Sequence, residues 1–160
     1  MITRLSSDAR KIILTSAAEE ARRRGDRRLG TDHLVLGLLH DEDSLAAKAL
    51  GTDLESARAA SDALDRAALA AIGVDVVPVG DSPQAVPVRS RRLPPLTSGA
   101  RAVLKTALEA TRQARSRRIE TRQLLLALLD RERPDPAAEL LHALGVDPSA
   151  VRVRLEGSEE

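Results

Sequence analysis

The stretch that decides the fold is LGTDHLVLGLL, residues 29–39, because a related stretch, IETRQLLLALL, occupies residues 119–129. Each stretch places a threonine, Thr31 or Thr121, just before a run of apolar residues. A threonine hydroxyl at the start of a helix can accept a hydrogen bond from a free N–H of the first turn. The runs LVLGLL and LLLALL are apolar on nearly every side, which is typical of a buried helix. We therefore expect each stretch to form the central helix of one half of the molecule.

The two halves also begin alike. Residues 5–14, LSSDARKIIL, align with residues 96–105, LTSGARAVLK, so that Leu, Ser, Ala and Arg recur at matched positions. In both halves the apolar residues then recur at three- and four-residue steps, which predicts an amphipathic first helix. The copies differ by one residue between these starts and the central helices. The extra residue must lie in the first helix of the first half or in the turn after that helix.

Each half continues with two shorter helices. We expect these helices over residues 44–50, from residue 54 into the sixties, over residues 136–144 and over residues 148–155. Gly145 can end one helix of the second half, and Asp147 with Pro148 can begin the next. The sequence thus predicts four helices in each half.

A long spacer separates the halves. Residues 72–95 contain five of the eight prolines, and valine alternates with Pro and Gly there. This composition suits an extended Pro/Val linker, which is either a mobile loop or a strap packed across the halves. The predicted organisation is one all-α domain of two pseudo-twofold four-helix repeats over residues 1–156. Its parts are repeat one (5–71), the linker (72–95) and repeat two (96–155), and residues 157–160 form a tail.

The composition supports a helical core and narrows the function. The 160 residues include no Phe, Tyr or Trp, so the core must be built from Leu, Ala, Val and Ile. The net charge of +1 does not favour a nucleic-acid binder, which usually shows a clear basic excess. The absence of cysteine excludes disulfides, thiolate zinc sites and cysteine nucleophiles. No run of 18 apolar residues is present, and the N-terminus lacks the apolar core of a signal peptide, so we expect a cytoplasmic protein.

The start MITRLSSDARKII, the EEAR at residues 19–22 and the repeated central phrase together resemble the N-terminal domain of Clp/Hsp100 unfoldases, especially of the ClpC type. That family is built from two four-helix repeats in pseudo-twofold relation, with a hallmark phrase similar to IGTEHILLGLL. The resemblance covers about residues 1–155. The sequence contains no G-x-x-x-x-G-K-[ST] P-loop for ATP phosphates. We therefore expect a stand-alone form that lacks the ATPase modules and does not hydrolyse ATP.

The resemblance implies a binding role and a first site. In the family this domain binds adaptor proteins and substrates, and some members read phosphoarginine with the acid of the repeated phrase. The matching residues here are Thr31 and Asp32, although aspartate is one methylene shorter than the family's glutamate. In the second copy the acid position holds Arg122, a cation that repels a guanidinium, so that copy is predicted to have lost the site.

The resemblance also implies a partner-binding surface where the starts of the two halves meet. In the family this surface takes adaptors and, in some actinobacterial members, cyclic peptide natural products. The corresponding residues are Ile2, Arg10, Ile13, Leu96, Arg101 and Lys105. Ile2 and Leu96 stand where the family usually has aromatic residues, which changes the contact area and the stacking geometry offered to a partner.

Other polar features have plainer interpretations. His33 beside Asp32 could serve as a catalytic base, but a structural histidine at a helix N-terminus is the favoured interpretation. His40 and His142 do not share a metal spacing with His33, and the acids at 41–43 are not followed by a calcium-loop pattern. No metal or cofactor is predicted. The arginine clusters favour solvated helix ends, and they comprise Arg22–Arg24 with Arg27 and Arg28, Arg89 with Arg91 and Arg92, and Arg115 with Arg117 and Arg118.

The sequence therefore predicts a non-catalytic binding module of the Clp proteolytic system. We expect it to bind substrates, adaptors or peptide-like ligands and to modulate a ClpC-type unfoldase, or to act as its decoy. Three alternatives stay open. One is an enzyme that uses Asp32 and His33, another is an arginine-rich nucleic-acid binder, and the last is a scaffold whose ligand sites have decayed.

Overall fold

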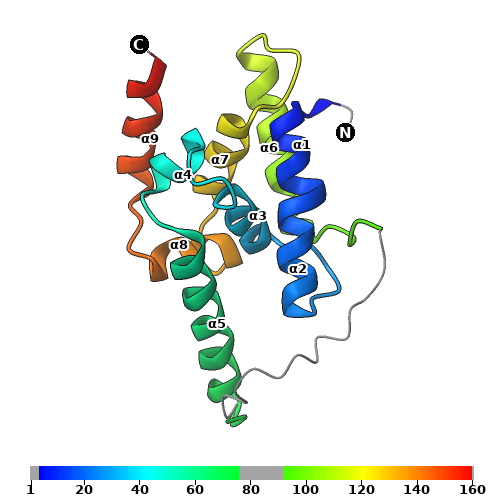
Figure 1. The fold of residues 1–160 in the computed structure, drawn as a ribbon, viewed down its shortest axis with the longest axis vertical. Coiled ribbons are helices and arrows are strands. Elements are labelled where there is room, and N and C mark those ends of the chain that lie inside the picture. Colours follow the sequence, from blue (N-terminus) through cyan, green and yellow to red (C-terminus); the bar gives the residue numbers. More distant parts are fainter. Residues whose placement is uncertain (1–3, 76–91, 160) are drawn as a thin grey trace.

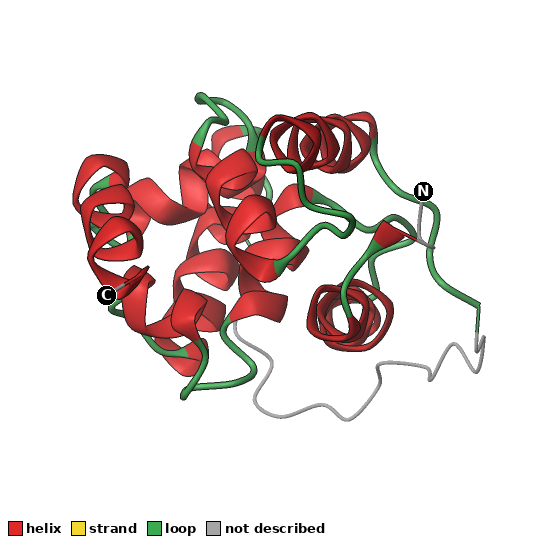
Figure 2. Ribbon diagram, turned by 90° about the horizontal axis from the view of Figure 1, so that it is seen from above, coloured by secondary structure: helices red, strands yellow, loops and turns green. Residues whose placement is uncertain are grey.

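The computed structural model describes residues 4–75 and 92–159, and these form helices joined by turns (Figures 1 and 2). The first half contains α1 (Ser7–Lys11), η2 (Ile12–Ala17), α2 (Ala18–Arg24), α3 (Thr31–Leu38), α4 (Leu45–Leu50) and α5 (Leu54–Ala71). The second half contains α6 (Ser98–Gln113), α7 (Thr121–Leu129), α8 (Pro136–Ala143), α9 (Pro148–Glu156) and the short η3 (Gly157–Glu159). Since α1, η2 and α2 follow one another without a break, and η3 continues directly from α9, the described residues of each half form four helical segments. The all-α prediction is confirmed.

Two short backbone pairings join the halves crosswise. Leu5 at the start of the first half pairs with Ile119, and Leu96 at the start of the second half pairs with Leu29. The hydrogen bonds of the two pairings correspond one for one. They run from Ser6 N to Ile119 O (2.9 Å), from Ile119 N to Arg4 O (2.7 Å), from Thr97 N to Leu29 O (3.0 Å) and from Leu29 N to Pro95 O (2.9 Å). The predicted pseudo-twofold relation is therefore visible in the backbone.

The extra residue of the first half lies inside its first helix. Gly25 and Arg115 end the first helices of the two halves with left-handed φ angles of 74° and 55°. Twenty positions separate Leu5 from Gly25, but nineteen separate Leu96 from Arg115. The segment Ile12–Ala17 is a π-helix, a form that accommodates one additional residue per turn. The turn after each first helix has the same length in both copies.

The two central helices fill the core, as their apolar sequences predict. The side chains of Leu34, Leu36 and Leu38 in α3 and of Leu124 and Leu128 in α7 are at most 1 % exposed. Small residues let other helices approach closely in the absence of aromatic side chains. A Cβ atom added to Gly37 of α3 would lie 3.0 Å from the backbone nitrogen of Ala17 in η2. The core is thus packed from aliphatic side chains and close backbone contacts.

The prediction that Thr31 and Thr121 cap their own helices is wrong. The N-cap residues are Gly30 and Glu120, one position earlier. The Gly30 N–H donates to His33 Nδ1 at 2.9 Å, and the Glu120 N–H donates to Gln123 Oε1 at 3.1 Å. A residue at the third helical position thus supplies the cap in each copy, which leaves the threonine hydroxyls outside it.

The four shorter helices lie where the sequence predicts them, although α5 continues to Ala71 and is longer than its counterpart α9. Gly145 follows α8 with a φ of 68°, and Asp147 accepts a hydrogen bond from Ser149 N at the start of α9. Most of the predicted linker, residues 76–91, lies outside the described residues. Among the described helices, none is both long and apolar enough to cross a bilayer.

Candidate functional site

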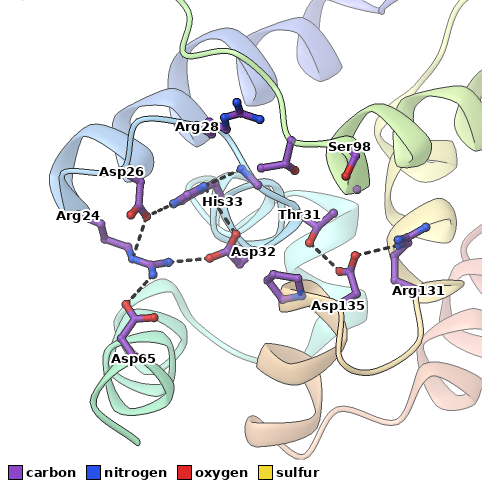
Figure 3. Close-up of a pocket in the computed structure, with 14 residues that line it drawn as sticks. Arg24, Asp26, Arg28, Thr31, Asp32, His33, Asp65, Ser98, Arg131 and Asp135 are labelled. Carbon is purple, nitrogen blue, oxygen red and sulfur yellow. Dashed lines mark hydrogen bonds and ion pairs between the residues drawn. The ribbon is translucent and has the colours of Figure 1, made fainter. Parts of the chain in front are cut away.

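A pocket of about 510 Å³ lies between the halves, beside the N-terminus of α3. Repeat one contributes residues from the turn after α2 and from α5, and repeat two contributes the start of α6 and the loop before α8 (Figure 3). The predicted ligand residues Thr31 and Asp32 both line this pocket. The cationic side chains in its lining are Arg24, Arg28 and Arg131. The pocket therefore combines the predicted acid with side chains of the opposite charge.

Asp32 already has a cationic partner from its own chain. Arg24 Nη1, at the end of α2, lies 2.6 Å from Asp32 Oδ2. The same guanidinium contacts Ser61 Oγ at 3.0 Å, Asp65 Oδ2 at 2.5 Å and Asp26 Oδ2 at 3.4 Å. The side chains of Arg24 and Asp32 are 12 % and 15 % exposed, so the pair is largely shielded from water. The Arg24 guanidinium thus occupies the space next to the Asp32 carboxylate (Figure 3).

The charge of Arg24 is stabilised by its carboxylate partners. Burial alone would lower the pKa of Arg24, but the nearby carboxylates, Asp32 first, raise this pKa above its ordinary value. The prediction that this arginine cluster forms solvated helix ends is therefore wrong for Arg24. Its side chain is a structural cation that joins α2, α3 and α5.

His33 has a structural role. Its Nδ1 accepts the Gly30 N–H, which requires that Nδ1 carry no proton. Its Nε2 therefore donates to Asp26 Oδ2 at 2.8 Å. The imidazole is 3 % exposed, and both ring nitrogens are occupied by these bonds. Neither nitrogen is available to act as a base toward a ligand in the pocket.

The Thr31 side chain links the two repeats through hydrogen bonds. Its hydroxyl donates to Asp135 Oδ1 at 2.6 Å and accepts the Ala137 N–H at 3.1 Å, at the first turn of α8. Asp135 also accepts from Arg131 at 3.0 Å (Figure 3). Thr31 thus supplies the capping chemistry expected of it, but to a helix of the other repeat. Sequence spacing could not reveal that partner, because the two residues are 104 positions apart.

The predicted partner-binding surface is only partly a surface. Ile13 is 1 % exposed and packs in the core, so its assignment to that surface is wrong. Arg10, Arg101 and Lys105 are exposed, and Leu96 is half-buried. Arg101 folds back so that its guanidinium donates to the Leu96 carbonyl at 3.1 Å. The remaining member, Ile2, lies outside the described residues.

The second repeat has a corresponding pocket of about 610 Å³ beside the N-terminus of α7. Thr121 and Arg122 line it, together with residues from α1, η2 and the loop before α4. The start of α1 and the loop before α4 are the pseudo-twofold counterparts of the start of α6 and the loop before α8, which line the pocket around Asp32. The acids in its lining are Asp8, Glu19, Asp41 and Glu120. The position of the ligand-reading acid therefore holds a cation in a pocket with acidic walls, and loss of the site there stays a prediction.

A buried ionic cluster that the sequence analysis missed supports the first repeat. Glu20 is fully buried, accepts from Arg58 Nη2 at 2.6 Å and contacts Arg23 Nε at 3.2 Å. His40 Nε2 lies 2.8 Å from the same carboxylate. Burial would raise the pKa of Glu20, but hydrogen bonds from Arg58, His40 and Arg23 outweigh it and lower this pKa from 4.5 to about 2. The sequence does contain one sign of this cluster, because the acid Glu20 follows Ala17 by three residues and therefore lies on the apolar stripe of the first helix.

Groups of side chains that could hold a metal ion are absent from the described part of the chain. The three exposed acids at 41–43 include one local contact, from Asp43 N to Asp41 Oδ1 at 3.1 Å. The side chains of this site can therefore recognise a ligand through ion pairs and hydrogen bonds.

Comparison with known proteins agrees with this architecture. The family model described as the Clp repeat (R) N-terminal domain matches residues 4–87 and 95–159. The chloroplastic chaperone protein ClpC2 of Oryza sativa subsp. japonica is 33 % identical over 158 residues, and the alignment covers 97 % of this chain and 15 % of that protein. The figures for the chloroplastic ClpC1 of Arabidopsis thaliana are the same. The chain therefore spans about 15 % of the length of these relatives.

A solved structure shares the fold. The N-terminal domain of the caseinolytic protease associated chaperone ClpD from Arabidopsis thaliana superposes with a TM-score of 0.74. The match covers 99 % of this chain and 96 % of that domain at 19 % sequence identity. Both repeats and their arrangement are therefore common to the two structures. The chain belongs to the Clp repeat N-terminal domain family, whose domains are binding modules of Clp unfoldases.

Proposed function

We propose that this chain is a non-catalytic binding module that acts on a ClpC-type unfoldase in trans. It would bind the adaptors or substrates of the unfoldase and either withhold them as a decoy or deliver them as an adaptor. The main observation that supports this proposal is the match of both repeats, over residues 4–87 and 95–159, to the Clp repeat N-terminal domain. The open pocket between the repeats supports the same role, since binding sites commonly lie where two structural units meet.

We further propose that the Asp32 pocket is a phosphoarginine-type site in which Arg24 competes with the ligand. A phosphorylated guanidinium carries donors at one end and a phosphate at the other. Asp32 suits the donors, and Arg28 and Arg131, which line the same pocket, suit the phosphate. A ligand guanidinium reaches Asp32 only after displacing Arg24, which would weaken its binding. This competition rests on the Arg24–Asp32 contact and can be tested separately from the Clp role.

The Clp role is tested by following degradation of a protein substrate by a full-length ClpC-type unfoldase with its protease, while this chain is titrated in. A decoy lowers the degradation rate as its concentration rises, and an adaptor raises it. The isolated N-terminal domain of the unfoldase, added in the same way, provides the positive control. An unchanged rate beside an active control would contradict the proposal.

A further inference from the structure

A third cleft, of about 460 Å³, lies along the first helix on the side of the turn before α7. Its polar lining consists of three cations, Arg10, Lys11 and Arg118, and two hydroxyl side chains, Ser7 and Thr15. Leu14 contributes an apolar wall. Among the described residues that line it, none carries a carboxylate. The cleft therefore has the charge of a site for an anion.

The three cations have no ionic partner within the part of the chain that the structure describes. Several other arginines of this protein are paired, as Arg24 is with Asp32, Arg58 with Glu20 and Arg133 with Glu139. The side chains of Arg10, Lys11 and Arg118 are exposed, and they take part in no ion pair or hydrogen bond among the described residues. Unpaired cations of like sign repel one another, so an anion between them lowers the free energy of the arrangement.

The pseudo-twofold counterpart of this cleft differs in the placement of its cations. Lys11 corresponds to Ala102 in repeat two, and Arg118 corresponds to Arg28, which lines a pocket that also contains Asp26 and Asp32. Arg101, the counterpart of Arg10, donates its guanidinium to the Leu96 carbonyl. Lys105 of repeat two aligns with Leu14, so the counterpart carries its cations at different positions and lacks the apolar wall that Leu14 provides.

The π-helix is the second feature that separates the two repeats, and it forms part of this cleft. Leu14 and Thr15 both belong to η2 (Ile12–Ala17). A π-helical turn is costly, and within α-helices such turns occur frequently at functional sites. The irregular backbone and the unpaired cations thus coincide at one position in the molecule.

We propose that this cleft binds an acidic peptide segment of a partner protein. Arginine offers forked donors that match a carboxylate, lysine adds a point charge, and Leu14 can contact the methylenes of a Glu or Asp side chain. Asp8 and Glu19 line the pocket on the other side of Lys11, so the region favourable to an anion ends with the cleft and suits a short acidic segment. This inference goes beyond the proposed function, because it holds whichever protein carries the acidic segment.

Fluorescence anisotropy with a labelled six-residue Asp/Glu peptide tests the proposal on the full chain. The Lys11→Glu/Arg118→Glu variant leaves Arg10 of the partner-binding surface unchanged, and Lys48→Glu/Arg112→Glu is the matched control at two exposed cations outside the cleft. We expect saturable binding that weakens with salt, falls at least roughly tenfold in the first variant and is retained in the control. Circular dichroism melts confirm folding, and Lys11→Gln/Arg118→Gln serves as a milder variant.

Three results would overturn the proposal. They are no binding of the acidic peptide at low salt, an equal loss in the control variant, and binding of the Asn/Gln version of the peptide with the same affinity. Stronger binding of a labelled single-stranded oligonucleotide, lost in the same cleft variant, would reassign the cleft to nucleic acid. Because no Clp protein is present in this assay, its failure leaves the degradation test unaffected.

Discussion

Arg24 Nη1 lies 2.6 Å from Asp32 Oδ2, so the acid that resembles the family's ligand-reading residue is already paired with a guanidinium from its own chain. Arg24 is held by Ser61, Asp65 and Asp26 as well. A free guanidinium must compete with this intramolecular partner, whose effective concentration is high. In the proposed phosphoarginine-type site, the affinity would therefore depend on Arg24 as well as on Asp32.

Arg24→Gln is expected to strengthen phosphoarginine binding roughly tenfold, because the ligand then has no internal competitor for Asp32. Isothermal titration calorimetry of the variant and the parent chain measures this change. Arg27→Gln, at an exposed position of the same turn, provides the control for loss of one positive charge. Arg24→Gln combined with Asp32→Asn should lose the gain, and an unchanged affinity in Arg24→Gln would refute competition by Arg24.

Thr31→Val should lower the free energy of unfolding by about 1–2 kcal/mol, because Asp135 and the Ala137 N–H lose the same hydroxyl partner. Thr121→Val is the pseudo-twofold control. The Thr121 hydroxyl makes no side-chain hydrogen bond within the described residues, so this substitution should change the stability by less than about 0.5 kcal/mol. Urea unfolding monitored by circular dichroism gives both values. Equal losses in the two variants would show that the contact between repeats is not specific to Thr31.

The stability of the fold should fall on acidification because of Glu20. Its pKa is about 2 in the folded chain against 4.5 as the reference value, so the unfolded chain binds a proton first as the pH falls. The stabilisation is therefore complete above about pH 5 and is lost between about pH 5 and pH 2. The shift corresponds to about 3 kcal/mol.

Urea unfolding at pH 7 and at pH 3 checks this pH dependence. Glu20→Gln should destabilise the chain at pH 7 and show a smaller further loss at pH 3 than the parent. Glu19→Gln, at an exposed neighbouring acid, should behave like the parent chain. An undiminished pH dependence in Glu20→Gln would mean that other carboxylates dominate the acid response.

Gly37→Ala tests the close approach of α3 and the π-helix. Alanine improves helix propensity by about 1 kcal/mol, but its Cβ would lie 3.0 Å from Ala17 N and 3.1 Å from Ala17 Cβ. Overpacking of this kind typically costs about 1–3 kcal/mol, and the neighbouring backbone has little freedom to move. We expect a net loss of about 1 kcal/mol in urea unfolding. Gly157→Ala, where the added Cβ meets nothing within 4 Å, should cause no loss.

The fold could be predicted from the sequence because its signals are periodic and repeated. The apolar runs 34–39 and 124–129 indicated the buried helices, and Gly145 with Asp147 marked a boundary that the structure confirms. The one-residue difference between the copies also indicated where an irregularity must lie. Its form, the π-helix at Ile12–Ala17, depends on the fit of that helix against α3 and could not be read from spacing.

The site was less accessible to sequence reasoning because its contacts are long-range. Thr31 and Asp32 do lie in one pocket, but the residues that satisfy their side chains, Asp135 and Arg24, come from other elements. The prediction for Ile13 fails for a different reason. This residue lies on an amphipathic helix and is predicted to belong to the partner-binding surface, but its side chain packs in the core. Periodicity predicts which face of a helix is apolar, whereas the partner of a polar atom is decided by the tertiary structure.

The central claim, that this chain is a Clp-type binding module, is tested most directly by biolayer interferometry of the chain against an immobilised ClpC-type unfoldase, its adaptor and a protein substrate. The isolated N-terminal domain of that unfoldase serves as the positive control. The account predicts saturable binding of this chain to at least one of the three proteins. Absence of binding to all three, by a folded chain and beside a control that binds, would contradict it.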